Sequence, residues 1–242
     1  LNLLQNDLSI ESAEINNIYK VNQTEIAEPN DEYFKEQWGI AAVNCKNAWK
    51  KASGNGVLVG IIDTGIDYYH LDLVNQLWIN SAEDLNKNGT FEPWHFTEVR
   101  NGITGDLNGI DDDGNGFTDD VIGYDFVDQQ NANIGDYFER DPIPFDEMGH
   151  GTLVSGVIAA QSNNKIGISG IAYNSKIVTL RAFDATGNAE TDDIASAIIY
   201  AALNRIKVLN FSFGDNVNSP LLHQAIKFAN SLGCVMISSK GN

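Results

Sequence analysis

The chain has 242 residues, 43% of them hydrophobic, so it can form a sizeable core and is not disordered throughout. Its formal net charge of −18 argues against nucleic acid as a partner, because binding phosphates requires Lys and Arg. The longest strongly apolar stretch, residues 194–203, is about half of the ~20 residues that a membrane span needs, so no span is expected. Two cysteines are too few for a disulfide scaffold, and we expect Cys45 and Cys234 to be separate buried thiols.

The first half of the chain contains one clear strand signal. Residues 1–29 are polar, rich in Asn and Glu, and predict an extended or peripheral segment. Residues 56–63 form a short apolar, β-branched run, which is typical of a strand buried on both faces. Residues 64–149 are rich in Gly, Asn and Asp and predict loops.

From residue 150 onward the pattern alternates between helices and strands. The expected elements are a helix over 150–161, a strand over 176–183, a helix over 191–204, a strand over 207–213, a helix from Ser219-Pro220 to Gly233 and a strand over 234–239. Thr191 is the expected N-cap of its helix, with Asp192 and Asp193 in the first turn. This alternation predicts an α/β fold with a mostly parallel sheet and helices on both faces.

Polar residues gather at the ends of three of the expected strands. Asp63 ends the first, Ser212 and Gly214 lie at the end of another, and Gly241-Asn242 follow a third. The carboxyl ends of parallel strands are where sites form in such sheets. Position alone leaves two interpretations open, a functional site or ordinary turns.

Four sequence blocks carry a family resemblance. They are Asp63-Thr64-Gly65-Ile66-Asp67, HGTLVSG at 150–156, NFSFG at 210–214 and SKGN at 239–242. In this order they resemble the subtilases, the subtilisin-like serine proteases, over roughly residues 30–242. DTG alone would be weak, because aspartic proteases also contain it, and HGT alone is moderately specific. Four blocks in order, at expected strand and helix ends, are a strong signal.

The resemblance implies a serine endopeptidase that hydrolyses peptide bonds by a Ser-His-Asp triad through an acyl-enzyme. His150 would take the proton of the serine hydroxyl, since the pKa of a free imidazole is ~6.5. Asp63 would hold the imidazole in the correct tautomer, and Asn242 would donate to the oxyanion. We therefore expect Asp63 and His150 to lie within ~2.6–3.2 Å of each other.

The resemblance also implies the contacts with a polypeptide substrate. Two segments would pair with the substrate backbone, namely Gly187-Asn188-Ala189 and Ser212-Phe213-Gly214. Main-chain hydrogen bonds would then supply affinity, and side pockets would supply selectivity.

One departure from the family pattern concerns the nucleophile. In subtilases it lies in a Gly-Thr-Ser motif downstream of the oxyanion asparagine, and no Gly-Thr-Ser occurs in these 242 residues. We therefore expect the chain to stop before the catalytic serine, the domain to be incomplete at its C-terminus and the fragment itself to be inactive. The alternative function is a non-catalytic calcium-binding subtilase-like module or a pseudoprotease. A Gly-Thr-Ser downstream of Asn242 would favour the protease.

The N-terminal part of the chain resembles the boundary between the propeptide and the mature enzyme in a zymogen. Residues 9–20 resemble the end of a subtilase propeptide, and residues 30–34 resemble the start of a mature enzyme. Residues 1–29 are therefore interpreted as a propeptide tail or, alternatively, an N-terminal extension, and residues 30–242 as the N-terminal part of the catalytic domain. The family implies a secreted or cell-surface protein with its own propeptide as a partner, although no signal peptide opens this chain.

An acidic insert occupies residues 83–147, with 17 acidic and 3 basic residues and thus −14 of the total charge. Two stretches in it follow the DxDxDG pattern of calcium loops. Their odd positions are Asp111, Asp113, Asn115, Phe117 and Asp119 in one loop, and Asp84, Asn86 and Asn88, with Glu92 ninth, in the other. Neither has the Glu of an EF-hand at position twelve. Calcium is favoured over a solvated turn for residues 111–120, and both interpretations stay open for 84–92.

A third calcium site is implied by the resemblance alone. The residues matching the site common in subtilases are Asp72, Asn164, the backbone oxygens of Ile166 and Ile168, and Asp31. The spacing from helix to loop is one residue longer here than in the subtilisin pattern.

Overall fold

A computed structural model describes residues 28–129, 134–214 and 218–241. Nearly all of the segment interpreted as a propeptide tail, residues 1–29, and the oxyanion candidate Asn242 therefore lie outside the described residues. Both interpretations remain predictions.

The centre of the fold is a five-stranded sheet, all of whose neighbouring strands are parallel, in the order β4-β5-β1-β6-β7. The strands are β1 (Leu58–Asp63), β4 (Gly123–Asp125), β5 (Lys176–Arg181), β6 (Val208–Phe211) and β7 (Val235–Ser238). All but β4 form where a short apolar run was expected, although each is shorter than its run, because the terminal residues bend into loops. The predicted α/β fold with a mostly parallel sheet is confirmed.

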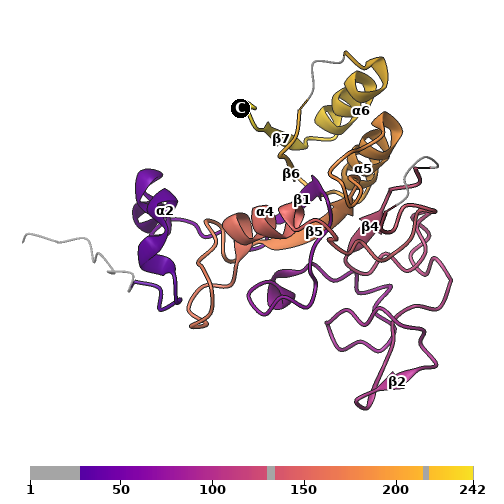
Figure 1. Cartoon of the computed structure of the whole chain (residues 1–242), viewed down its shortest axis with the longest axis horizontal. Helices are drawn as coiled ribbons and strands as arrows, with labels where there is room; N and C mark the ends of the chain where they lie inside the picture. Colours follow the sequence, from indigo (N-terminus) through magenta and orange to yellow (C-terminus); the bar gives the residue numbers. More distant parts are fainter. Residues whose placement is uncertain (1–27, 130–133, 215–217, 242) are drawn as a thin grey trace, which may run out of the picture.

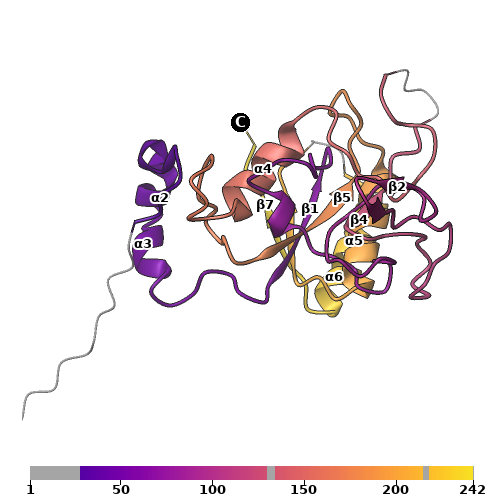
Figure 2. The same ribbon diagram turned by 90° about the horizontal axis from the view of Figure 1, so that it is seen from below.

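Helices cover both faces of this sheet (Figure 2). The helix α4 (His150–Ala159) packs on one face, where Ala159 joins Val59, Ile61 and Ile177 in a buried cluster. On the other face α5 (Thr191–Leu203) and α6 (Pro220–Ser231) enclose a second cluster. The β-branched residues of β1 alternate between these clusters, which is why its sequence is continuously apolar.

The helix ends agree with expectation in one case and not in the other. Ser219 caps α6, because its side chain accepts a 3.2 Å hydrogen bond from the Leu222 amide, and Pro220 follows as the first helical residue. The prediction for α5 was wrong by one residue. Its N-cap is Glu190, without a side-chain cap, and Thr191 is already helical. Asp192 and Asp193 lie in the first turn as expected.

The N-terminal elements form a separate small layer, at the left of Figure 1. They are the short helices η1 (Phe34–Glu36), α2 (Trp38–Ala42) and α3 (Cys45–Ala48). Trp49 connects these helices to the rest of the molecule, because its indole donates a 2.8 Å hydrogen bond to the Ile171 carbonyl. Cys45 and Cys234 are buried free thiols, as predicted, and the Cys234 thiol donates a 3.2 Å hydrogen bond to the Ile206 carbonyl.

The long segment between β1 and α4 is almost entirely loop, as its composition predicts. Its regular elements are η2 (Val74–Gln76), the edge strand β4, and a two-stranded antiparallel ribbon of β2 (Val99–Arg100) and β3 (Ile103–Thr104). The ribbon projects from the body at the lower right of Figure 1. Among the described residues, no helix has the length and apolar character needed to cross a membrane.

Candidate active site and cation-binding loops

The end of β1 and the start of α4 bring Asp63 and His150 together. His150 Nδ1 lies 2.6 Å from Asp63 Oδ1, within the expected range, although the residues are 87 positions apart. The Asp63 side chain is 3% exposed, whereas that of His150 is 47% exposed. A buried carboxylate can therefore orient an imidazole whose other face is open to a reacting group.

Two glycines make this approach feasible. Gly65 has φ of +107°, a left-handed conformation that favours glycine, and follows Asp63 by two residues. Gly151 follows His150, and a Cβ atom on it would lie 2.2 Å from the Gly65 carbonyl oxygen. The backbone of α4 thus touches the turn after β1 directly, and this contact sets the distance between the two functional side chains.

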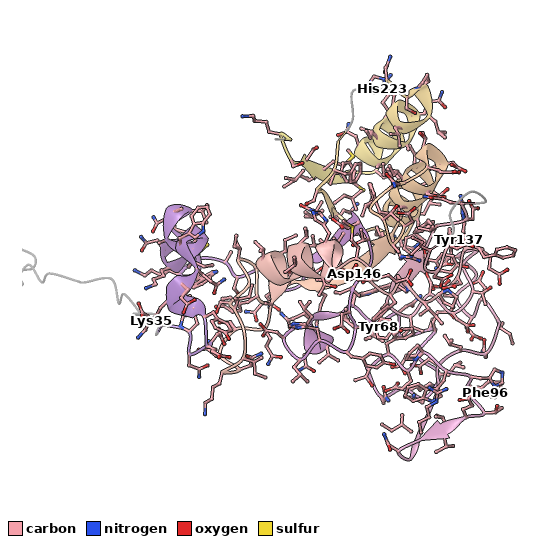
Figure 3. All side chains as sticks on the ribbon, in the orientation of Figure 1. Lys35, Tyr68, Phe96, Tyr137, Asp146 and His223 are labelled. Atoms are coloured by element: carbon pink, nitrogen blue, oxygen red, sulfur yellow. The ribbon has the colours of Figure 1, made fainter. Side chains whose placement is uncertain are left out.

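A buried carboxylate, Asp146, locks the same junction (Figure 3). It accepts hydrogen bonds from the Thr64 hydroxyl at 2.8 Å and from the Thr152 amide and hydroxyl at 2.8 and 2.6 Å. Thr64 in turn accepts a 2.9 Å bond from the Gly151 amide. Burial opposes ionisation of Asp146, but these hydrogen bonds, together with one from the Gly149 amide, lower its pKa below the ordinary value.

A cavity of about 230 Å³ adjoins the pair. Besides Asp63 and His150 it is lined by Thr64, Met148, Phe183, Gly187, Ser212 and Phe213. Of the six predicted substrate-contacting residues, Gly187, Ser212 and Phe213 therefore lie at the cavity. The other three do not line it. Asn188 closes a turn with Asp184, Ala189 packs against the core and Gly214 is exposed.

The loop at residues 84–92 gathers most of its predicted ligands around one acidic side chain. The side-chain amides of Asn86 and Asn88 each donate a 3.1 Å hydrogen bond to Glu92 Oε2. Asp84 instead accepts a 2.9 Å bond from the Gly89 amide. Asp106 also joins this group, since its Oδ2 accepts a 2.7 Å bond from the Glu92 backbone amide. Burial raises the pKa of Asp106 to about 7.

The loop at residues 111–119 winds tightly around Asp111. That carboxylate accepts hydrogen bonds from the amides of Gly114 at 2.7 Å and of Gly116 at 2.8 Å, which lower its pKa. Asp113 and Asn115 lie in the same turn, where the backbone amide of Asn115 donates a hydrogen bond to Asp113 Oδ1 at 2.9 Å. The Asp119 carboxylate is turned away from these residues. Both of its oxygens accept bonds from the backbone of residues 108–109.

Phe117, predicted as a ligand of this loop, contributes its side chain to the core. Its ring packs edge-on against Tyr124 and Tyr200, with centroid distances of 5.0 and 4.8 Å. Its backbone amide donates to Asn115 Oδ1 at 2.8 Å, so the residue remains part of the loop.

The third predicted calcium site brings together residues from three parts of the chain. Asn164 donates to Asp72 Oδ1 from its side chain at 2.7 Å and to Asp31 Oδ1 from its backbone at 3.0 Å. The Ile168 amide donates to Asp72 Oδ2 at 2.9 Å, and Ile166 lies between them in the loop. Both carboxylates are buried, and burial raises the pKa of Asp72.

Two other groups of three acidic side chains lie close together but face an arginine. They are Asp125, Asp136 and Asp141, near Arg181, and Asp128, Asp192 and Asp193, near Arg140. Both arginines bond to members of their group, so a positive charge is already present there.

Comparison with known proteins agrees with this geometry. The model of the subtilase family matches residues 54–242, which include both Asp63 and His150. The chain belongs to the subtilase family. Two curated relatives are a "Thermophilic serine proteinase" of Bacillus sp. (strain AK1), 31% identical over 99% of this chain and 46% of the relative, and "Thermitase" of Thermoactinomyces vulgaris, 29% identical over 88% of this chain and 58% of the relative.

A solved structure supports the same subtilase fold. It is described as a protease from Pseudoalteromonas arctica, has a TM-score of 0.64 and is 26% identical, covering 88% of this chain and 58% of that one. The subtilase chain thus spans about half the length of the two curated relatives above. The family and the names of these relatives support serine-type peptidase activity.

Sequence reasoning missed several residues of this subtilase site. Thr64 lay inside a quoted motif, yet nothing in the motif says that its hydroxyl bonds to Asp146. Met148 and Phe183 line the cavity but have no motif of their own. The usable signal for Asp146 was its place four residues before His150, at the N-terminus of a predicted helix, where a carboxylate is favoured.

Proposed function

We propose that the protein containing this chain is a secreted, calcium-stabilised serine endopeptidase of the subtilase family. The single observation that carries the proposal is the 2.6 Å contact between Asp63 and His150 at the mouth of a cavity. The nucleophile would be a serine from outside these 242 residues, as the resemblance implies. The fragment alone would then lack peptidase activity.

In this mechanism His150 is the general base. Its Nδ1 faces Asp63 Oδ1, so the proton on Nδ1 is held by the carboxylate and Nε2 is free to accept the serine proton. The developing imidazolium is stabilised by Asp63, whose position is in turn held by the 2.8 Å bond from the Thr64 amide. Nε2 then returns the proton to the leaving amine. Asn242 would donate its side-chain amide to the oxyanion.

The cavity supports a polypeptide substrate. Met148, Phe183 and Phe213 supply apolar contact, and the ring centroids of Phe183 and Phe213 lie 4.8 Å apart. Ser212 follows β6 directly at the cavity, so an extended substrate could add to that backbone as a further strand. Residues 1–29 would be the tail of a propeptide that occupies the enzyme before its activation.

Calcium would be held by the acidic loops and by the Asp31–Asp72 group. The residues fit a hard cation, because buried carboxylate oxygens in the insert lack any hydrogen-bond partner among the described residues, as Asp106 Oδ1 does. Calcium would supply structural stability there, by joining segments that carry repelling charges.

The decisive experiment measures peptide hydrolysis by the full-length protein and by its Asp63→Asn variant. We expect kcat to fall on the order of 10⁴-fold, because the amide would favour the wrong imidazole tautomer. Asp67→Asn is the matched control, since it is the same substitution four residues away and the Asp67 carboxylate bonds to the Tyr69 amide rather than to His150. Equal activity of wild type and Asp63→Asn would refute the triad. A full-length protein without activity, and without reaction with a fluorophosphonate, would favour the pseudoprotease.

A further inference from the structure

Glu83 is a fully buried carboxylate with one unpartnered oxygen. Its exposed fraction is 0%, and its Oε1 accepts hydrogen bonds from the backbone amides of Asp112 and Asp113 at 2.8 and 3.0 Å. Its Oε2 is buried and, within the described part of the chain, has no hydrogen-bond partner. Leaving a buried carboxylate oxygen unpaired is costly, so this oxygen is available to a positive partner.

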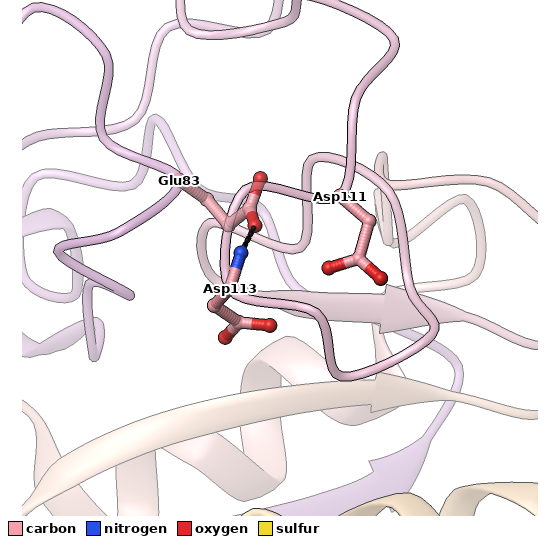
Figure 4. Close-up of side chains that lie close together, drawn as sticks. All are labelled: Glu83, Asp111 and Asp113. Carbon is pink, nitrogen blue, oxygen red and sulfur yellow. Dashed lines mark hydrogen bonds between the residues drawn. The ribbon is translucent and has the colours of Figure 1, made fainter.

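Two further carboxylates share this space (Figure 4). Glu83, Asp111 and Asp113 each offer an oxygen atom, and these atoms lie within 4.8 Å of one another. None of the ion pairs in the described residues involves any of the three. Ionised carboxylates at this spacing repel one another, and no positive side chain within the described ranges is paired with them, which distinguishes the group from the two acidic groups that face arginines.

A rigid frame holds these carboxylates in place. The Asn80 side-chain amide donates to Asp113 Oδ2 at 2.9 Å and to Asp120 Oδ1 at 3.0 Å. Asp120 also accepts a hydrogen bond from the hydroxyl of Tyr200, a fully buried residue of α5. The turn that carries Glu83 is anchored as well, since the Glu83 amide donates to the Asn80 carbonyl at 3.0 Å.

We propose that Glu83, Asp111 and Asp113 form a single calcium site in which Glu83 supplies a ligand from outside the 111–120 loop. The inference rests on the proposed calcium binding of the insert and goes beyond it. Three carboxylates with oxygens around a glycine-rich turn suit a hard divalent cation. The bound ion joins the turn at residues 80–84 to the loop, and through Asp120 and Tyr200 it braces the insert against α5.

The test compares calcium binding by the full-length protein and by its Glu83→Gln variant. Glutamine keeps the shape and the oxygen that accepts from Asp112 and Asp113, so the fold is retained while the charge is lost. Calorimetric titration with calcium should show one site weakened at least tenfold. The melting temperature in chelator should stay equal or rise, whereas the increment produced by calcium should shrink. Glu98→Gln, an exposed carboxylate of the same insert, is the matched control and should change neither quantity.

Other outcomes separate this inference from the calcium proposal itself. If Asp111→Asn loses one ion but Glu83→Gln keeps the wild-type stoichiometry and Kd, Glu83 is not a ligand and the inference is wrong, although calcium binding stands. If Glu83→Gln lowers the melting temperature equally with and without calcium, Glu83 is merely structural and the inference is again wrong. If the wild-type protein binds no calcium, both proposals fail. Peptidase activity is measured separately and tests the proposed catalytic triad.

Discussion

The junction of β1 with α4, which includes Asp146, and the acidic insert before it at residues 83–120 position their side chains mainly in different ways. At the junction, backbone touches backbone, and the space next to Gly151 has no room for a methyl group. In the insert, side-chain carboxylates hold the backbone, as Asp111 does for the amides of Gly114 and Gly116. Both regions contact apolar clusters on the sheet, but the insert also carries a large excess of negative charge.

This difference predicts which changes destabilise each region. Close-packed backbone tolerates no added volume but is insensitive to ions. Loops held by carboxylates tolerate changes of volume, yet their stability depends on what balances the charge. The two regions should therefore respond to different perturbations, and each of the following experiments addresses one side of the comparison.

The largest effect is expected at the junction, from Gly151→Ala. The added Cβ would lie 2.2 Å from the Gly65 carbonyl oxygen, so α4 must shift and the Asp63–His150 contact must lengthen. We expect a loss of about 3 kcal/mol in the free energy of unfolding, and a large loss of peptidase activity in the full-length protein. Urea unfolding and peptide hydrolysis measure the two. Gly39→Ala, where nothing lies within 4 Å of the new atom, should leave the activity unchanged and keep or raise the free energy of unfolding, because alanine favours the helix α2 more than glycine does. An active Gly151→Ala enzyme would contradict the contact described here.

Calcium removal should produce the next largest effect, in the insert and around the Asp31–Asp72 group. At calcium concentrations ~100 times Kd, a single site adds about 2.7 kcal/mol to the free energy of unfolding, and a chelator removes it. Hydrogen exchange should therefore speed up in residues 80–120 and in the loop at residues 164–168, and remain slow in β1 and α4. Magnesium, which prefers smaller octahedral sites, serves as the control ion. Uniform faster exchange over the whole sheet would show that the two regions are not separable.

The smallest effect is expected from Asp146→Asn, which tests whether the junction has an electrostatic component. Hydrogen bonds lower the pKa of Asp146, so its ionised form adds stability above the unfolded-state pKa of ~4 and loses it as pH falls through the folded-state pKa. Asparagine should cost about 1–3 kcal/mol at pH 7 and less near pH 3. Urea unfolding at the two pH values measures this. A cost independent of pH would mean that shape alone matters at this position.

Much of the architecture could be predicted because it depends on local patterns. The apolar run at 56–63 and the alternation after residue 150 located every strand of the main sheet except β4, which has only three residues and lies within a loop-rich segment. Asp63 and His150 were recognisable because each lies in a motif at the end of its element. The cap of α5 was misplaced by one residue, since Thr191 and Glu190 are both compatible with a helix start.

What the sequence by itself determined is the order of elements, the family, and the residue types that can carry the chemistry, because these depend on short-range periodicity and on motifs. Only the tertiary structure decided which distant groups meet. Glu83 lies 28 positions before Asp111 and belongs to no motif, yet it shares its space, whereas Asp119 fits the calcium pattern and is turned away. The physical reason is that long loops carry no periodic signal. Their conformation follows from which amides reach each buried carboxylate, and that is settled only when the chain is folded.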